Sequence, residues 1–139
     1  MRKLVVPTER RTQLVDVTAE VRRTLAGQSG GVAVLFVPHT TAGILIQAGS
    51  EGAAEVAADV EAALERIVDE GWGWRNSEEG DRNPWAHVRA ALTASSVTIP
   101  LEQGELALGD LQTIFLCELD GAARADPLRL RGLTPRRQS

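Results

Sequence analysis

The sequence predicts an α+β fold from three observations about its length, its element order and its turns. The 139 residues, 43% of them hydrophobic, are enough for one core, and no repeat, linker or shift of composition divides them. Helical patterns are separated by consecutive strand patterns, whereas a doubly wound fold would alternate strand and helix. Hairpin signals favour a mostly antiparallel or mixed sheet with helices packed on it. We therefore expect residues 1–139 to form a single domain.

The first half of the chain predicts two strands, a helix and two more strands, at residues 3–6, 12–17, 18–27, 32–37 and 44–46. Thr18 suits an N-cap, because its hydroxyl can accept a hydrogen bond from a backbone N–H of the first turn. The run at residues 32–37 is continuously apolar, which is typical of a strand buried on both faces. Pro38 ends that run.

The second half predicts two helices and four strands, at residues 51–70, 85–93, 96–101, 105–108, 111–119 and 128–130. Ser50 caps the long helix and Gly71 ends it, while Pro84 suits the first position of the short one. Gln103-Gly104 is a hairpin turn signal, and we expect the final strand at a sheet edge. The long helix has an acidic face, interpreted as solvated rather than metal-binding, of Glu55, Asp59, Glu61, Glu65 and Asp69.

Charge and composition exclude some classes of function. The formal net charge is −4 and the pI is near 5.2, whereas non-specific nucleic-acid binding needs clustered Lys and Arg. We therefore expect no nucleic-acid partner, although a local basic pocket for a small anion remains compatible with this charge. The single cysteine allows no intrachain disulfide. No apolar run of membrane-spanning length and no signal-peptide pattern are present, so we expect a cytoplasmic protein without a membrane partner.

The segment Pro38-His39-Thr40-Thr41-Ala42-Gly43 is the first candidate site. It follows the apolar run, so His39 lies at a strand end, where side chains converge on a pocket. An imidazole titrates near neutral pH and can serve as acid, base or metal ligand. Thr40 and Thr41 supply hydroxyls that can bind an anion or orient water. The alternative interpretation is a histidine that only caps a turn.

The second candidate segment runs from Gly80 to His87 and contains the other histidine of the chain. Its Asp81 and Asn83 can orient an imidazole or bind a cation, and Arg89 lies just beyond it. If His39 and His87 meet in space, they form either an acid–base pair or part of a metal site.

A divalent metal, zinc or magnesium, is the cofactor that these residues suggest. Two histidines make an incomplete zinc site, which needs a third protein ligand, and the candidates are Cys117, Glu118 and Asp81. Neighbouring residues of a strand point to opposite faces, so Cys117 and Glu118 are not expected in the same pocket. A lone cysteine in an apolar run is more often part of the core. The metal-ligand prediction is His39, His87 and Cys117.

Three tryptophans, Trp72, Trp74 and Trp85, cluster around the polar loop at residues 72–84. A loop of that length is often functional. The tryptophans either line a ligand cleft or pack at a dimer or trimer seam, and the sequence leaves both interpretations open. The chain has no phosphate-binding P-loop, no dinucleotide glycine fingerprint and no nucleophile elbow.

Three blocks of sequence together resemble the YjbQ-like family, also called UPF0047 or secondary thiamine-phosphate synthase. They are residues 36–43 (FVPHTTAG), residues 86–92 with 96–100 (AHVRAAL and SVTIP) and residues 104–118 (GELALGDLQTIFLCE). The blocks occur in the order of the family and are spread over residues 36–118 of the chain. The resemblance implies an α+β fold, a homotrimer and a pocket that contains both histidines.

The resemblance also implies an activity. Thiamine-phosphate synthesis joins a pyrimidine diphosphate to a thiazole phosphate and releases pyrophosphate, so the expected partner is a small phosphorylated molecule. Negative charge builds on the leaving pyrophosphate, where a cation or an arginine clamp stabilises it. The candidate catalytic residues are His39, His87, Asp81 and Arg89, and the candidate ligand-binding residues are Thr40, Thr41, Asn83 and Gln112.

The chain departs from the family pattern after the first histidine block. Where the family has Ile-Asn-Glu, this sequence has Ile46-Gln47-Ala48, which removes a carboxylate able to act as ligand or base. Glu51, at the predicted start of the long helix, is the next acidic residue along the chain. Two hypotheses follow, an enzyme of the thiamine-phosphate-synthase kind and a trimeric protein that binds a metal or a small phosphate ligand without turnover.

Overall fold

The computed structural model describes residues 2–28, 30–49, 53–75, 83–120 and 128–133. Its helices and strands follow, one for one, the order expected from the sequence. They are β1 (Arg2–Val6), β2 (Gln13–Asp16), α1 (Thr18–Leu25), β3 (Val32–Phe36), β4 (Ala42–Ala48), α2 (Ala54–Ile67), α3 (Pro84–Ala91), β5 (Ser96–Glu102), β6 (Glu105–Leu106), β7 (Gln112–Glu118) and β8 (Leu128–Leu133). The α+β prediction is confirmed.

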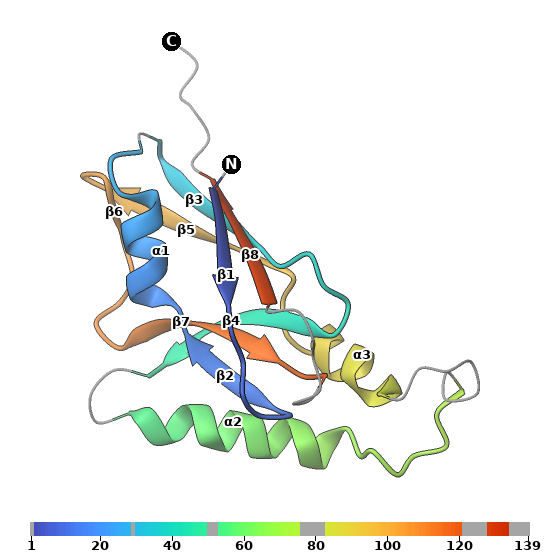
Figure 1. Ribbon diagram of the computed structural model, residues 1–139. Coiled ribbons are helices and arrows are strands. Elements are labelled where there is room, and N and C mark those ends of the chain that lie inside the picture. Colours follow the sequence, from blue (N-terminus) through green and yellow to red (C-terminus); the bar gives the residue numbers. More distant parts are fainter. Residues whose placement is uncertain (1, 29, 50–52, 76–82, 121–127, 134–139) are drawn as a thin grey trace.

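The strands form two antiparallel sheets. The larger sheet has the strand order β1-β8-β3-β5-β6, and the smaller one has the order β2-β7-β4. Figure 1 shows α1 beside the two sheets, α2 along the smaller sheet and α3 at the end of the molecule. The described residues are therefore layered as a large sheet, a small sheet and a pair of helices.

Two apolar cores hold these layers together. The first lies between the sheets and against α1, where Val21 and Leu25 join Leu35, Ile44 and Leu116. The second lies between the smaller sheet and the helices α2 and α3, and it contains Leu14, Leu64, Ala86, Phe115, Cys117 and Leu119. Strand β7 serves both cores, because successive side chains of a strand point to opposite faces. It is therefore buried from its second residue to its last.

Two expectations about the larger sheet are wrong. The last strand is not at an edge, because β8 pairs with β1 on one side and with β3 on the other. The apolar run that forms β3 is covered on one face only: Leu35 is 1% exposed, whereas Phe36 is 45% exposed. Within the described residues, nothing in the fold covers the face that carries Phe36, because both cores and all three helices lie on the other side.

Helix α2 is shorter than its sequence pattern suggests. It begins at Ala54 and ends at Ile67, and the predicted cap Ser50 lies outside the described residues. Glu61, predicted to belong to the solvated acidic face, is buried. Its carboxylate accepts a hydrogen bond from the backbone N–H of Leu14 at 2.8 Å and forms an ion pair with Arg10 at 2.9 Å. In the described ranges, no helix has both the length and the apolarity to cross a membrane.

Candidate functional site

His39 lies in the turn between β3 and β4, and its ring is held by the backbone of β8. The Nε2 atom accepts a hydrogen bond from the backbone N–H of Arg129 at 2.9 Å. This contact directs Nε2 at the backbone of β8 and so fixes the orientation of the imidazole ring. The histidine predicted at a strand end is therefore an oriented side chain.

The turn that carries His39 is anchored to the segment after α3. The backbone N–H of Val37 donates to the carbonyl of Ser95 at 2.8 Å, and that of Ile44 donates to the carbonyl of Ala94 at 2.8 Å. A side chain on Gly43 would overlap that of Thr93, which explains the glycine that ends the PHTTAG segment. The turn and α3 therefore meet at one end of the molecule (Figure 1).

His87 lies on α3, beside a groove of about 660 Å³. One wall of the groove is the turn that follows α2, with Trp72, Gly73, Trp74 and Arg75. The other wall is one face of α3, with Pro84, His87 and Val88 at helical spacing. The structure thus brings the two histidines to the same end of the molecule, and the described residues that line this groove include His87 and not His39.

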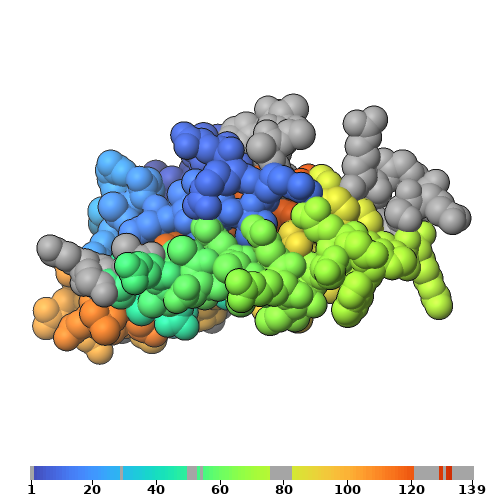
Figure 2. Space-filling model, turned by 90° about the horizontal axis from the view of Figure 1, so that it is seen from below, coloured from blue at the N-terminus to red at the C-terminus, as the bar shows by residue number. Residues whose placement is uncertain are grey.

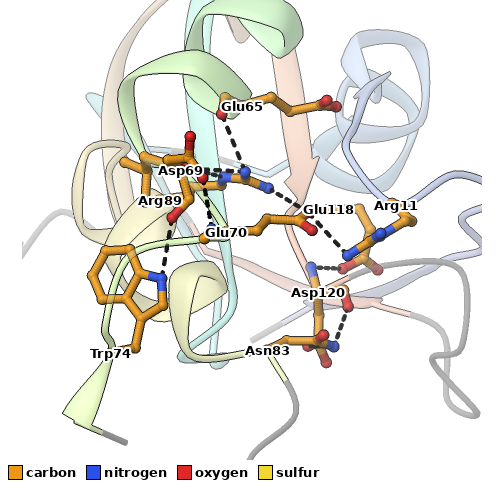
Figure 3. A network of polar contacts seen from close by, with 11 residues as sticks. Arg11, Glu65, Asp69, Glu70, Trp74, Asn83, Arg89, Glu118 and Asp120 are labelled. Carbon is orange, nitrogen blue, oxygen red and sulfur yellow. Dashed lines mark hydrogen bonds and ion pairs between the residues drawn. The ribbon is translucent and has the colours of Figure 1, made fainter. Parts of the chain in front are cut away.

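A polar network closes the end of β7 and ties it to α3 (Figure 3). Glu118 is fully buried, and its carboxylate accepts hydrogen bonds from the Thr8 hydroxyl and the Asp120 backbone N–H, both at 2.9 Å. The side-chain amide of Asn83, just before α3, donates to the backbone carbonyl and to Oδ1 of Asp120 at 2.6 and 2.8 Å. Since Glu118 pairs with Ala42, the first residue of β4, this network lies where the His39 turn enters that strand.

Sequence reasoning missed Thr8 and Asp120 as members of this network and indicated Glu118 only as a possible third metal ligand. The sequence feature that could have indicated Glu118 is an acidic residue at the end of an apolar strand. Such a residue is a functional candidate when it is buried. Thr8 gives no such signal, because it meets Glu118 across 110 positions of sequence. Asn83, predicted to bind ligand, has its side-chain amide on Asp120 in this structure.

Arg89 is directed into the fold. It is 2% exposed, and its guanidinium donates to the carbonyl of Val68 at 2.8 and 3.2 Å and to that of Glu65 at 3.4 Å. These carbonyls end helix α2, so Arg89 supplies the hydrogen bonds that the last turn lacks. Burial lowers the pKa of the Arg89 guanidinium, while the nearby Glu70 carboxylate, at 3.6 Å, opposes that effect. Arg89, predicted to act on a leaving group, thus has its guanidinium at the C-terminal cap of helix α2 in this structure.

Cys117 lies in the second core with no exposed surface. Burial raises the pKa of its thiol to about 12, whereas metals bind the thiolate. Across the described residues, no three His, Cys, Asp or Glu side chains come together as a metal site. His39, His87 and Cys117 therefore do not form the predicted set of three ligands within this chain.

The remaining candidates divide between the two ends of the molecule. Thr40 is exposed and Thr41 half-buried in the His39 turn. Gln112 pairs with Ala48, six residues along β7 from Glu118, which is about 20 Å at the rise of a strand. Its side-chain Oε1 accepts a hydrogen bond from the backbone N–H of Gly109 at 2.8 Å. Asp81 lies outside the described residues.

Comparisons with known proteins agree with this fold. A crystal structure of an uncharacterised conserved protein from Clostridium acetobutylicum has a TM-score of 0.83 at 30% identity, covering 96% of this chain and 98% of that one. A conserved hypothetical protein from Thermus thermophilus also has a TM-score of 0.83, at 31% identity, covering 97% of this chain and all of that one. Such neighbours are single-domain proteins with the same arrangement of helices on antiparallel sheets.

The family follows from the sequence comparisons. The family described as UPF0047 protein YjbQ-like matches residues 2–134. A UPF0047 protein of Archaeoglobus fulgidus is 36% identical over 119 residues, covering 86% of this chain and 90% of that protein. The UPF0047 protein YugU of Bacillus subtilis is 34% identical, covering 87% of this chain and 90% of that protein. This chain belongs to the YjbQ-like, or UPF0047, family.

Proposed function

We propose that this protein is an enzyme of the thiamine-phosphate-synthase kind, with His39 and His87 as its acid–base pair. It joins a pyrimidine diphosphate to a thiazole phosphate and releases pyrophosphate. The observation that supports this most is the hydrogen bond from the Arg129 N–H to His39 Nε2 at 2.9 Å. A side chain that does proton transfer needs a fixed orientation, and this contact supplies one.

In this proposal, arginines of strand β8 bind the leaving pyrophosphate, because the guanidinium of Arg89 is hydrogen-bonded to the end of helix α2. Arg129 is exposed and lies directly beside His39. Arg131 follows on the same face of the strand, since residues two apart in a strand share a face. A guanidinium can bind two phosphate oxygens at once, which suits it to a diphosphate leaving group.

The proposed assembly is a homotrimer that completes the site between copies. Val5 is 61% exposed and Phe36 is 45% exposed on the outer face of the larger sheet, where another copy would cover them. Gln47 and Ala48 stand where the family has Asn-Glu, and they lie with Gln112 at the far end of β4 and β7 from His39. If the His39 end and the Gln112 end of these strands contribute to one site, the two ends have to come from different copies of the chain.

The second candidate function is a trimeric protein that binds a metal or a small phosphate ligand without turnover. The observation that favours it is alanine at position 48, which leaves the family's Asn-Glu position without an acid. A binding protein needs the oriented histidines and the arginines of β8, but it does not need that base.

The test is the formation of thiamine phosphate and pyrophosphate from the two phosphorylated substrates by the purified protein. We expect His39→Ala to lower kcat about 100-fold, the usual contribution of a general acid or base, without changing the melting temperature. Glu20→Ala, exposed on α1, is the control that leaves kcat unchanged. Turnover that survives His39→Ala removes the catalytic role. Stoichiometric metal or phosphate binding with no turnover selects the second function.

A further inference from the structure

The groove beside His87 has an aromatic wall that is fixed in place before any ligand arrives. The rings of Trp72 and Trp74 stack with their centroids 5.2 Å apart. Trp74 Nε1 donates to the carbonyl of Asp69 at 3.1 Å, and the Trp74 N–H donates to the carbonyl of Trp72 at 2.8 Å. The Asp69 side chain also accepts from the Gly71 N–H at 2.6 Å. Figure 2 shows this segment, in yellow-green, at the end of α2 and next to α3.

The outer indole is available to a ligand. Trp72 is 59% exposed although it is stacked on Trp74, and Val88 on the opposite wall is 37% exposed. A volume of about 660 Å³ is within the range of small-molecule pockets. Two walls of this kind, an indole face and an apolar helix face, suit a flat ring, because aromatic rings gain stacking energy from each other beyond their buried area.

The charged side chains that line the groove favour flat molecules of one charge over those of the other. Among its described lining residues, the ionisable groups are His87 and Arg75, and none is a carboxylate. An arginine at the end of an aromatic slot favours an anionic substituent, which it can bind through two N–H groups. A cationic ring would meet Arg75 without a compensating acid in the described lining.

We propose that this groove binds a planar aromatic or heteroaromatic molecule that carries a negative charge, with its ring on Trp72 and its anionic group on Arg75. The inference rests on the proposed function in one respect, namely that His87 borders the groove and acts on the bound molecule. Beyond that function, the inference assigns the ring of the ligand to Trp72 and the recognition of its negative charge to Arg75.

The test is isothermal titration calorimetry of the full chain with naphthalene-2-sulfonate, using 2-naphthylmethylammonium and 2-naphthylmethanol as probes with the same ring. We expect the sulfonate to bind at least about ten-fold more tightly than the ammonium compound, because of the charge of Arg75. Trp72→Ala is expected to raise the Kd of the sulfonate about ten-fold, the usual effect of losing a stacking ring. Arg75→Gln is expected to raise the Kd of the sulfonate and to leave that of 2-naphthylmethanol unchanged.

Trp85→Phe is the matched control. Trp85 follows Pro84 directly but lies under the guanidinium of Arg11, whose carbon is 5.6 Å from the ring centroid, and it does not line the groove. We expect the Kd of the sulfonate to be unchanged in this variant. His39→Ala is expected to keep sulfonate binding while it loses turnover, so the two proposals fail separately.

Two results would overturn the inference. One is a Kd of the sulfonate that is the same in Trp72→Ala as in the unmodified protein, or weaker binding of the sulfonate than of the ammonium compound. The other is a loss of oligomer mass in Trp72→Ala by light scattering, which would make the tryptophans part of a seam between copies.

Discussion

The guanidinium of Arg89 donates two hydrogen bonds to the carbonyl of Val68, at 2.8 Å from Nη2 and 3.2 Å from Nε. This contact joins α3 to the end of α2 and, through Glu70, to Arg11 at 2.9 Å (Figure 3). A residue predicted from sequence to bind substrate is thereby part of the packing that sets the position of α3. Because α3 carries His87, this contact helps to set the position of His87 in the candidate site.

Replacing Arg89 should therefore destabilise the fold. Arg89→Met keeps an apolar stem of similar length but leaves the carbonyls at the end of α2 without their donor, and we expect a loss of about 3 kcal/mol in the free energy of unfolding. Urea denaturation followed by tryptophan fluorescence measures it. Arg66→Met, exposed in the last turn of the same helix, is the control and should change stability by less than about 0.5 kcal/mol. Equal stabilities of the two variants would contradict the capping role.

Local patterns predict the order of the elements, because hydrophobic periodicity, Pro84 at a helix start and Gln103-Gly104 at a turn are properties of neighbouring residues. Gln103 and Gly104 have φ values of +51° and +81°, as a two-residue hairpin turn with both central residues left-handed requires. The interior position of β8 is not predictable in this way, because it depends on pairing with β1 and β3, which lie far away in sequence.

The candidate site also combines features that the sequence predicts with features that it does not predict. His39 is predictable because its segment has a recognisable pattern and follows an apolar strand. Its hydrogen bond to Arg129, 90 residues further along, is not visible in any pattern. The burial of Arg89 against the end of α2 is not predictable for a related reason, since a buried and an exposed arginine look alike in sequence until the carbonyls that bind one of them are located.

Gly43 is the position where a single added methyl group should damage the turn that carries His39. A Cβ there would overlap the Thr93 side chain, so Gly43→Ala should lower the free energy of unfolding by about 2 kcal/mol. The added Thr93→Ala change removes the nearest atom and should restore part of that loss. Gly31→Ala is the control, because a Cβ at Gly31 meets nothing within 4 Å. Chemical denaturation of these variants checks this, and the absence of any rescue by Thr93→Ala would refute the steric explanation.

The Cys117 thiol should give the stability of the protein a distinct dependence on alkaline pH. Burial raises its pKa from an ordinary value of 9.0 to about 12. Below about pH 9 the thiol is protonated in both states, so the stabilising contribution is fully present. Between the two values only the unfolded chain loses the proton, and the free energy of unfolding should fall by about 1.4 kcal/mol per pH unit.

Other groups contribute little in that window, because the sequence has no tyrosine and Lys3 is its one lysine. Urea denaturation between about pH 9 and 11 should therefore show a slope that Cys117→Ala removes, whatever the variant does to the absolute stability. An identical slope in the two proteins would mean that Cys117 ionises as readily in the folded state as in the unfolded chain.

The outer face of the larger sheet is where the proposed trimer can be tested directly. Phe36, Arg131 and Lys3 lie side by side on neighbouring strands of that face, since directly paired residues of antiparallel strands point the same way. Light scattering of the unmodified protein should give about 45 kDa, three times the chain mass of 14.9 kDa. Phe36→Asp replaces an apolar contact by a carboxylate whose desolvation outweighs its pairing with Arg131 and Lys3, so it should reduce the mass to that of one chain.

Leu111→Asp is the matched control for this variant, because Leu111 is also a large apolar residue on the surface, 58% exposed, directly before the central strand of the smaller sheet. It should leave the trimer intact if the interface is the outer face of the larger sheet. A trimer that persists in Phe36→Asp and dissociates in Leu111→Asp would place the contact on the other side of the molecule. In that case the arginines of β8 would face solvent, and the pyrophosphate clamp proposed for them would have to come from one chain alone.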